Sequence, residues 1–359
     1  MGIKNLNTLF KKYVKNGIQT KKTKCFTNKV LAIDTSIYLY KFAYNNQNYI
    51  KKFLHQILKF WENSITPVYI FDGTPPIEKH NTLKKRKMCR DKLKNDISNL
   101  ENQVSDLNKC RNDKILELSN GNNEKTKEEI NELITQIKLV DGKLKKKTKS
   151  FIKITAKDIN NCKKLFNLLD IKYIVSNSES DILCANLQRH HSVDCCISDD
   201  LDFLTHGCNY LLRNYNYRDD TYTVYNLQII LQELNITYDQ FIDICILCGC
   251  DYTSKISGIG PINAYKLIQK HNNIEHIIEN VINNNEKSKY KIKEDFDYVI
   301  ARNMFKNKRD DCLISALTKD DFEIHNIDYE NLIIFLQENS VKFYPSKIQK
   351  YKNMLSYQK

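Results

Sequence analysis

Short apolar segments that end in acidic residues recur along this chain, and they constrain its fold more than any other feature. Four segments of strand type precede their acids: residues 29–33 before Asp34, residues 67–71 before Asp72, residues 171–175 before Glu179 and Asp181, and residues 193–198 before Asp199, Asp200 and Asp202. A single group of this kind is also typical of a solvated turn or of the first turn of a helix. Carboxylates about 4 Å apart repel by roughly 4 kcal/mol at an effective dielectric of about 20. The recurrence therefore favours one shared site that binds a cation.

Helical patterns separate these strands, which indicates an α/β fold. Residues 38–42 and 53–61 form apolar helical patterns between the first two strands, and residues 157–169 do so before the third. This alternation predicts a central, mostly parallel sheet with helices on both faces. We expect the functional residues to gather at the carboxyl ends of its strands.

The region from residue 84 to residue 150 is long, charged and helical in pattern. Its apolar residues step by three and four through residues 97–107 and again through residues 130–144, with a predicted turn at residues 119–123. We interpret the region as an antiparallel helical hairpin, with partial disorder as the alternative. Both of its roots are basic, and one of them contains Lys84 and Lys85. These roots are consistent with a phosphate-lined passage, with a solvated face or with a nuclear-import signal.

The second half of the chain continues the α/β pattern. Ser178 is predicted to cap the helix that carries Glu179 and Asp181, and the tyrosine-rich residues 210–225 are predicted to be irregular. A helix predicted at 238–248 leads to Asp251. Gly258 and Gly260 then precede a helix that opens at Pro261, so their backbone N–H groups could approach a phosphate closely.

Composition points to a polyanion as the partner. The 359 residues include 56 Lys and Arg against 43 Asp and Glu, which gives a net charge of +13. Because no signal peptide or transmembrane run is apparent, we expect a soluble intracellular protein without a membrane partner. The 12 cysteines are then expected to be reduced thiols. Residues 245–250 invite a zinc interpretation, but their spacing favours buried residues on a helix. The abundance of Asn, Lys and Ile is typical of an AT-rich genome, such as that of a large DNA virus or a protist.

These motifs, in this order, resemble one family over nearly the whole chain except the hairpin. The stretches that carry the resemblance are Met1-Gly2-Ile3, residues 33–36, residues 68–76, Ser178-Glu179-Ser180-Asp181, residues 200–205, and residues 247–252 leading into residues 258–261. Together they resemble the structure-specific 5′ nucleases, in particular the XPG/Rad-type flap endonucleases. The resemblance implies a PIN-like nuclease core, a helical arch and a helix–three-turn–helix element that grips duplex DNA.

The resemblance also assigns site residues. Seven carboxylates correspond to the family's metal site: Asp34, Asp72, Glu179, Asp181, Asp200, Asp202 and Asp251. Two Mg²⁺ ions, or Mn²⁺ in their place, are implied there, and Asp181 stands where the family usually has the longer Glu. Lys79 and Arg86 match the basic pair that faces the scissile phosphate. Tyr40 matches the aromatic residue that stacks on the terminal base, and Gly2 matches a glycine near the substrate path. The segment at Gly258 and Gly260 is similar to one that often holds K⁺.

We therefore expect five regions: residues 1–83 and 151–237 as the nuclease core, 84–150 as the arch, 238–275 as the helix–three-turn–helix region, and 276–359 as a C-terminal helical part packing on the core. Three departures limit the resemblance to flap endonucleases. Residues 45–49 form a shorter loop than the family uses near the 3′-flap pocket, and the hairpin is longer than the family's arch. No motif for a sliding clamp is found near the C-terminus, so coupling to a clamp is not expected. We expect a monomer whose partner is DNA with single-strand/duplex junctions.

The expected function is metal-dependent hydrolysis of DNA phosphodiester bonds near single-strand/duplex junctions. This corresponds to a 5′-flap endonuclease with 5′→3′ exonuclease activity, acting by a two-metal mechanism in DNA replication, repair or recombination. We expect it in the nucleus or cytoplasm, or at a viral replication site. A junction-resolving enzyme is the nearest variant. The alternatives from other classes are a catalytically silent DNA-bridging repair scaffold and an RNase on a related fold.

Overall fold

The structure is a computed structural model that describes residues 2–44, 47–121, 124–283, 290–306, 317–324 and 326–342. Parts of the predicted turn at 119–123 and of the loop at 45–49, and all of residues 343–359, lie outside the described residues. The described chain divides into two compact units. Unit 1 lies within residues 1–39, 48–80 and 156–359, and unit 2 lies within residues 40–47 and 81–155.

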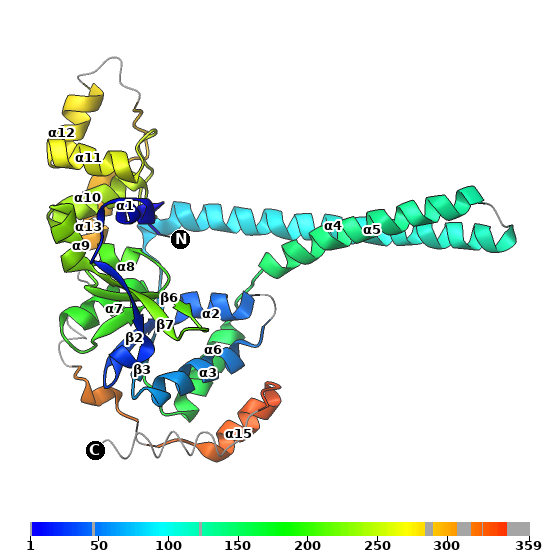
Figure 1. The fold of residues 1–359 in the computed structure, drawn as a ribbon, viewed down its shortest axis with the longest axis horizontal. Helices are drawn as coiled ribbons and strands as arrows, with labels where there is room; N and C mark the ends of the chain where they lie inside the picture. Colours follow the sequence, from blue (N-terminus) through cyan, green and yellow to red (C-terminus); the bar gives the residue numbers. More distant parts are fainter. Residues whose placement is uncertain are drawn as a thin grey trace. The chain divides into compact units, whose positions relative to one another are not determined.

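A seven-stranded sheet forms the centre of unit 1 (Figure 1). Its strands, in chain order, are β1 (Ile18–Lys22), β2 (Val30–Asp34), β3 (Thr66–Phe71), β4 (Tyr173–Val175), β5 (Cys195–Ile197), β6 (Tyr210–Asn216) and β7 (Thr221–Asn226). Their order across the sheet is β1-β7-β6-β5-β2-β3-β4. The five strands from β6 to β4 are parallel, whereas β7 pairs antiparallel with both β6 and β1. The predicted α/β class with a mostly parallel sheet is confirmed.

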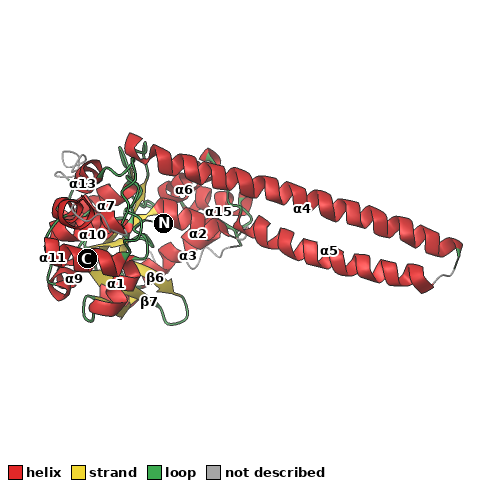
Figure 2. Ribbon diagram, turned by 90° about the horizontal axis from the view of Figure 1, so that it is seen from above, coloured by secondary structure: helices red, strands yellow, loops and turns green. Residues whose placement is uncertain are grey.

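Helices cover this sheet, as the sequence pattern indicates, and further helices stack beyond them (Figure 1 and Figure 2). They are α1 (Leu6–Tyr13), α2 (Thr35–Ala43), α3 (Tyr49–Glu62), α6 (Ala156–Leu168), α7 (Ser180–Arg189), α8 (Asp202–Thr205), α9 (Leu227–Leu234), α10 (Tyr238–Cys248), α11 (Pro261–His271), α12 (Ile274–Ile277), α13 (Tyr298–Lys306) and α15 (Tyr329–Glu338). Shorter turns are η1 (Thr23–Phe26), η3 (Ile77–Lys79), the π-helical η4 (Ile278–Asn283) and η5 (Asp320–Phe322).

The central strands are buried because helices cover them. Every residue of β2 is buried, and α7 packs against β2, β3 and β5. On β3, Tyr69 stacks on Phe166 of α6 with ring centroids 4.1 Å apart, and Phe53 of α3 meets both rings edge-on. Burial of such large aromatic side chains is a main source of folding free energy. The parallel register of β5, β2 and β3 brings their carboxyl ends to one edge of the sheet.

The prediction of an irregular segment at residues 210–225 is wrong. Residues 210–226 form the β6–β7 hairpin, and β7 also pairs with β1, a strand that none of the sequence patterns indicates. Tyrosine and threonine favour strands, particularly where cross-strand neighbours pack against them. Here Tyr222 is buried and its ring lies 4.7 Å from that of Tyr215.

The prediction that Ser178 caps a helix is also wrong. Helix α7 begins at Ser180, and Glu179 is its N-cap residue. The Glu179 side chain accepts no capping hydrogen bond from the backbone N–H groups of the first turn. Instead, Asp72 Oδ1 accepts a hydrogen bond of 2.9 Å from the Ser180 backbone N–H. The carboxylate that follows β3 therefore satisfies a free donor at the start of α7.

Unit 2 contains the predicted helical hairpin. It consists of α4 (His80–Asn120) and α5 (Glu124–Ser150), which run antiparallel (Figure 2). The predicted apolar stripes at 97–107 and 130–144 are half-buried, and no residue of α5 is fully buried. Two ion pairs connect the helices, at 3.0 Å between Lys114 and Glu129 and at 2.5 Å between Lys147 and Asp96.

The predictions about the cysteines agree with the structure. Eleven cysteines of the described residues are free thiols, and Cys245, Cys248 and Cys250 are buried at and just beyond the end of α10. Burial raises the pKa of the Cys248 and Cys250 thiols to about 12, so neither is a thiolate poised for zinc. Within the described chain, no helix combines the length and the apolar character needed to cross a membrane.

Candidate metal centre

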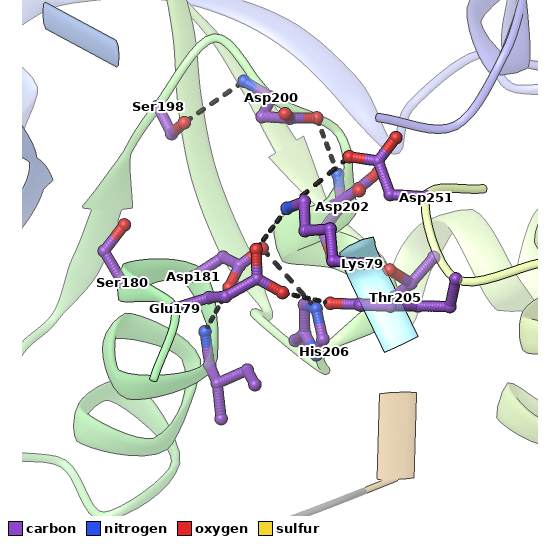
Figure 3. A network of polar contacts seen from close by, with 12 residues as sticks. Lys79, Glu179, Ser180, Asp181, Ser198, Asp200, Asp202, Thr205, His206 and Asp251 are labelled. Carbon is purple, nitrogen blue, oxygen red and sulfur yellow. Dashed lines mark hydrogen bonds and ion pairs between the residues drawn. The ribbon is translucent and has the colours of Figure 1, made fainter. Parts of the chain in front are cut away.

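Seven acidic side chains lie at one edge of the unit 1 sheet. Asp34 ends β2, and Asp72 directly follows β3. The others stand just before or at the start of α7, between β5 and α8, and after α10: Glu179, Asp181, Asp200, Asp202 and Asp251. Figure 3 shows most of this group, with the side chains turned toward one another.

Asp34 is the most enclosed acid on the β2 side. It is 7% exposed and accepts hydrogen bonds from Ser198 Oγ at 2.9 Å and from the Ile37 backbone N–H at 3.2 Å. Burial, together with repulsion from Asp72, raises the pKa of Asp34 to about 7. Ser180 Oγ, at 3.4 Å, joins this carboxylate to the start of α7.

Asp200 and Asp202 lie against the N-terminal segment. The Ile3 backbone N–H donates to Asp202 Oδ1 at 2.7 Å, and the Asp202 N–H donates to Asp200 Oδ1 at 3.2 Å. Burial, and then the charges of Asp200 and Asp251, raise the pKa of Asp202 well above its ordinary value. Gly2 has φ +76°, and a Cβ there would lie 2.0 Å from Asp200 Oδ1 and 2.3 Å from Asp202 Oδ1. Any residue with a Cβ at this position would collide with these carboxylate oxygens, so the position requires glycine.

Lys79 places a positive charge inside the cluster. This residue ends η3, and its ammonium group contacts Glu179 and lies 3.4 Å from Asp251 Oδ2. Burial alone would lower the pKa of Lys79, but the charges of Glu179 and Asp181 more than compensate and raise it. The side chain is therefore a permanent cation inside the acidic cluster.

Asp181 faces a buried histidine. Its Oδ1 accepts a hydrogen bond of 2.8 Å from the Ile182 N–H, and its Oδ2 lies 3.5 Å from His206 Nε2. Burial and the charge of Glu179 raise the pKa of Asp181 well above its ordinary value. Burial, and then the cations Lys79 and Arg189, lower the pKa of His206 to about 3, so its ring is neutral near pH 7.

The chemistry of this donor set fits hard divalent cations. All seven groups are carboxylates, the ligands that Mg²⁺ and Mn²⁺ prefer. Burial and mutual repulsion raise the pKa of Asp34, Asp181 and Asp202, so added positive charge would be favourable. Among the residues that the structure describes, no group of three or more acidic, histidine or cysteine side chains is already arranged to hold a metal ion. Metal binding would therefore require the carboxylates to move closer together.

The remaining predicted residues lie on two other parts of the chain. Lys84, Lys85 and Arg86 are exposed on α4, and Tyr40 is 40% exposed on α2. These four residues belong to unit 2, and their roles stay predictions.

The predicted phosphate-binding turn precedes α11. Gly258 has φ +87°, and Gly260 is the residue before the helix, with no atom within 4 Å of the position its Cβ would take. Pro261 is the first residue of α11, as expected. The open space at Gly260 leaves room for a phosphate at this helix start.

Several residues that position the acids were not identified from the sequence. Ser198 and Ser180 bind Asp34, and Tyr252 donates its hydroxyl to Glu179 Oε2 at 2.6 Å. His206, which the sequence motifs did not single out, lies against Asp181. Each of them lies within a few residues of a predicted acid, and that proximity was the available signal.

The fold and the acidic site define the class of PIN-like 5′ nucleases. Comparison with family models agrees, because residues 1–93 match the XPG N-terminal domain and residues 170–251 match the XPG I-region. The chain is 31% identical over 324 residues to flap endonuclease 1 of Scheffersomyces stipitis, covering 85% of this chain and 75% of that protein. It is 29% identical to flap endonuclease 1-B of Oryza sativa subsp. japonica, covering 98% and 78%. The chain therefore belongs to the XPG/Rad-type flap endonuclease family.

Solved structures share the fold. The catalytic core of Rad2 in complex with a DNA substrate superposes with a TM-score of 0.67 at 18% identity, covering 99% of this chain and all of that one. Flap endonuclease-1 from Methanococcus jannaschii superposes with a TM-score of 0.60 at 21% identity, covering 98% and 99%.

Proposed function

We propose that this protein is a structure-specific DNA nuclease that hydrolyses phosphodiester bonds near single-strand/duplex junctions, as a 5′-flap endonuclease with 5′→3′ exonuclease activity. The observation that carries the proposal is the gathering of seven carboxylates and Lys79 at the carboxyl edge of a parallel sheet. Family membership supports DNA as the substrate, and a net charge of +13 is suited to binding it.

The seven acids Asp34, Asp72, Glu179, Asp181, Asp200, Asp202 and Asp251 would hold the metal ions, with Mg²⁺ as the expected ion and Mn²⁺ as a substitute. Two bound divalent cations would supply activation of water and stabilisation of the leaving oxygen. Ser198 and Ser180 bind Asp34 by hydrogen bonds and Tyr252 binds Glu179, so these side chains would limit the rotation of two of the proposed ligands.

Lys79 is proposed to change partners during the reaction. Its ammonium group contacts Glu179 and lies 3.4 Å from Asp251 Oδ2, so it offsets part of the cluster's negative charge without DNA. A phosphate diester that enters the site offers an alternative anionic partner. Together with Arg86, which we propose for the same phosphate, Lys79 would then offset negative charge that develops on the scissile group.

Duplex DNA is proposed to bind at the start of α11. The open space at Gly260 would let the backbone at this helix start approach a phosphate, and a K⁺ ion held there would strengthen the contact. Because phosphate contacts dominate such binding, the affinity for DNA should fall steeply with salt.

The proposal is tested by cleavage of end-labelled 5′-flap, nicked, blunt and single-stranded DNA in Mg²⁺. Asp200→Ala should abolish cleavage and leave DNA binding largely intact. Asp199→Asn is a matched control, because Asp199 Oδ1 accepts a hydrogen bond of 2.9 Å from the Asn214 N–H on β6 and an asparagine keeps an oxygen acceptor there. This variant should cleave as the wild type does.

The products distinguish the alternatives. Discrete products at the flap base that vanish in Asp200→Ala support the endonuclease, whereas ladders of mononucleotides favour a 5′→3′ exonuclease. Faster cleavage of a matched RNA junction would identify an RNase. If the wild type binds all four DNA substrates but cuts none in Mg²⁺ or Mn²⁺, the catalytic proposal is wrong and a DNA-bridging scaffold takes its place.

A further inference from the structure

His206 is a buried imidazole whose polar atoms have no hydrogen-bonding role. The residue is 3% exposed, and neither ring nitrogen makes a hydrogen bond to any part of the chain that the structure describes. Leaving a polar group buried and unsatisfied costs free energy, so an imidazole at such a position calls for an explanation. Its Nε2 points toward the acidic cluster (Figure 3).

The distance between His206 and Asp181 is informative. Nε2 and Oδ2 are 3.5 Å apart, which is longer than an N–H···O hydrogen bond. Two donor atoms that share one cation with bonds of about 2.1 Å and an angle between 90° and 110° lie about 3.0–3.4 Å apart. The observed separation is close to that range, so a cation could be held by both atoms with little movement.

The surrounding structure fixes the imidazole in this place. The His206 backbone N–H donates to Asp202 O at 3.0 Å, and its carbonyl accepts from Arg189 at 3.0 Å. The ring packs on Phe305 of α13 with centroids 5.3 Å apart, and Phe305 in turn packs on Tyr252, which binds Glu179. A donor held in this way needs no ordering when a cation binds.

We propose that His206 Nε2 is a nitrogen ligand of the metal centre, paired with Asp181 on one cation. The inference rests on the proposed function, because it assumes that the carboxylate cluster binds metal ions. Asp181 has one methylene fewer than Glu, and an imidazole beside it supplies a donor that the shorter side chain alone does not. The site is then a mixed nitrogen and oxygen set instead of an all-carboxylate one.

A nitrogen ligand changes which cation the site prefers. Mg²⁺ favours oxygen donors, whereas imidazole strengthens the binding of transition metals such as Mn²⁺ and Co²⁺. Replacing His206 with Phe should therefore weaken Mn²⁺ binding by about tenfold, the lower end of the range for lost support at metal sites. It should weaken Mg²⁺ binding much less, and the ratio of the two affinities is the quantity to measure.

The direct test is pulsed EPR on the full-length protein loaded with Mn²⁺. We expect ¹⁴N couplings typical of a bound imidazole, replaced by ¹⁵N couplings when histidine is selectively ¹⁵N-labelled, and absent in His206→Phe. His276→Phe is the matched control, since this exposed residue on α12 lies beside His271 O at 3.0 Å, and it should keep the signal. His206→Gln takes the place of His206→Phe if that variant does not fold.

The outcomes separate this inference from the proposed function. If Mn²⁺ binds in a manner that Asp200→Ala abolishes but shows no histidine coupling, His206 is not a ligand and the nuclease proposal stands. A signal that persists in both His206 variants also overturns the inference. If Mn²⁺ binding is absent in the wild type or unaffected by Asp200→Ala, the metal centre itself is wrong.

Discussion

Replacing Gly2 with alanine should disable the acidic cluster while leaving the protein folded. The Cβ would lie 2.0 Å from Asp200 Oδ1 and 2.3 Å from Asp202 Oδ1, although real Cβ atoms essentially never approach another atom within 3.0 Å. The backbone at this position has φ +76°, a conformation that costs a residue with a side chain about 1–2 kcal/mol. Either the N-terminal segment or the two carboxylates must move.

The size of the effect follows from that geometry. Relief of the closer contact requires a shift of at least 3.0 − 2.0 = 1.0 Å. A misplacement of about 1 Å in catalytic groups costs on the order of 100-fold in rate, which corresponds to about 2.7 kcal/mol of transition-state stabilisation. We therefore expect a loss of this order in the cleavage rate of Gly2→Ala.

The assay is single-turnover cleavage of 5′-flap DNA in Mg²⁺, with thermal unfolding measured beside it. Gly142→Ala is the matched control, because a Cβ at this position of α5 meets no atom within 4 Å. It should keep full activity and stabilise its helix by about 0.5–1 kcal/mol. If folded Gly2→Ala cleaves within about threefold of the wild type, the reasoning from close approach is refuted.

Three further predictions concern single side chains. In metal-free protein, Asp34→Asn should raise the melting temperature at pH 8, and the gain should fade toward pH 4, because a carboxyl whose pKa is about 7 in the folded state opposes folding once it ionises. Tyr252→Phe removes a hydrogen bond of 2.6 Å to Glu179 and should slow cleavage by about tenfold at unchanged DNA affinity, as expected for a bond to a charged group. Arg302→Ala leaves the buried Asp243 without its partner at 2.8 Å and should cost about 3–5 kcal/mol of unfolding free energy in a urea titration.

Each of these has an outcome that contradicts it. A stability gain of Asp34→Asn that is larger at pH 4 than at pH 8 would reverse the sign of the linkage. A fall in DNA affinity in Tyr252→Phe would mean that its hydroxyl acts on the substrate and not on Glu179. For Arg302, the comparison is Lys306→Ala, which breaks an exposed pair with Asp239; equal losses in the two variants would contradict the burial argument.

The elements that carry the site could be predicted because their signals are local. An apolar run before an acid marks β2, β3 and β5, and the periodicity at 238–248 gives the bounds of α10. The contacts that join distant segments could not be predicted from the sequence. The donor at the start of α7 is satisfied by Asp72, which lies 108 residues earlier in the sequence. β7 is held by β1, some 200 positions away, so its tyrosine-rich sequence alone did not reveal a strand.

His206 illustrates the same limit at the site. In the sequence it follows Thr205 as an ordinary residue at a helix end. Only the packing of α13 beneath it and the position of Asp181 beside it show where its ring points. A functional role that depends on a residue from another helix can be assigned only when the three-dimensional structure is known.

The order of strands in the sheet determines how the segments before and after the helical hairpin are held together. β2 and β3 precede the helical hairpin in sequence, whereas β5 and β4, which flank them in the sheet, follow it. The pairings β2–β5 and β3–β4 therefore join the two halves of the polypeptide. A backbone cut at Gly121, between α4 and α5, would leave two fragments that interlock through one hydrogen-bonded sheet. Such fragments, made separately, would be candidates for reassembly into a single split nuclease.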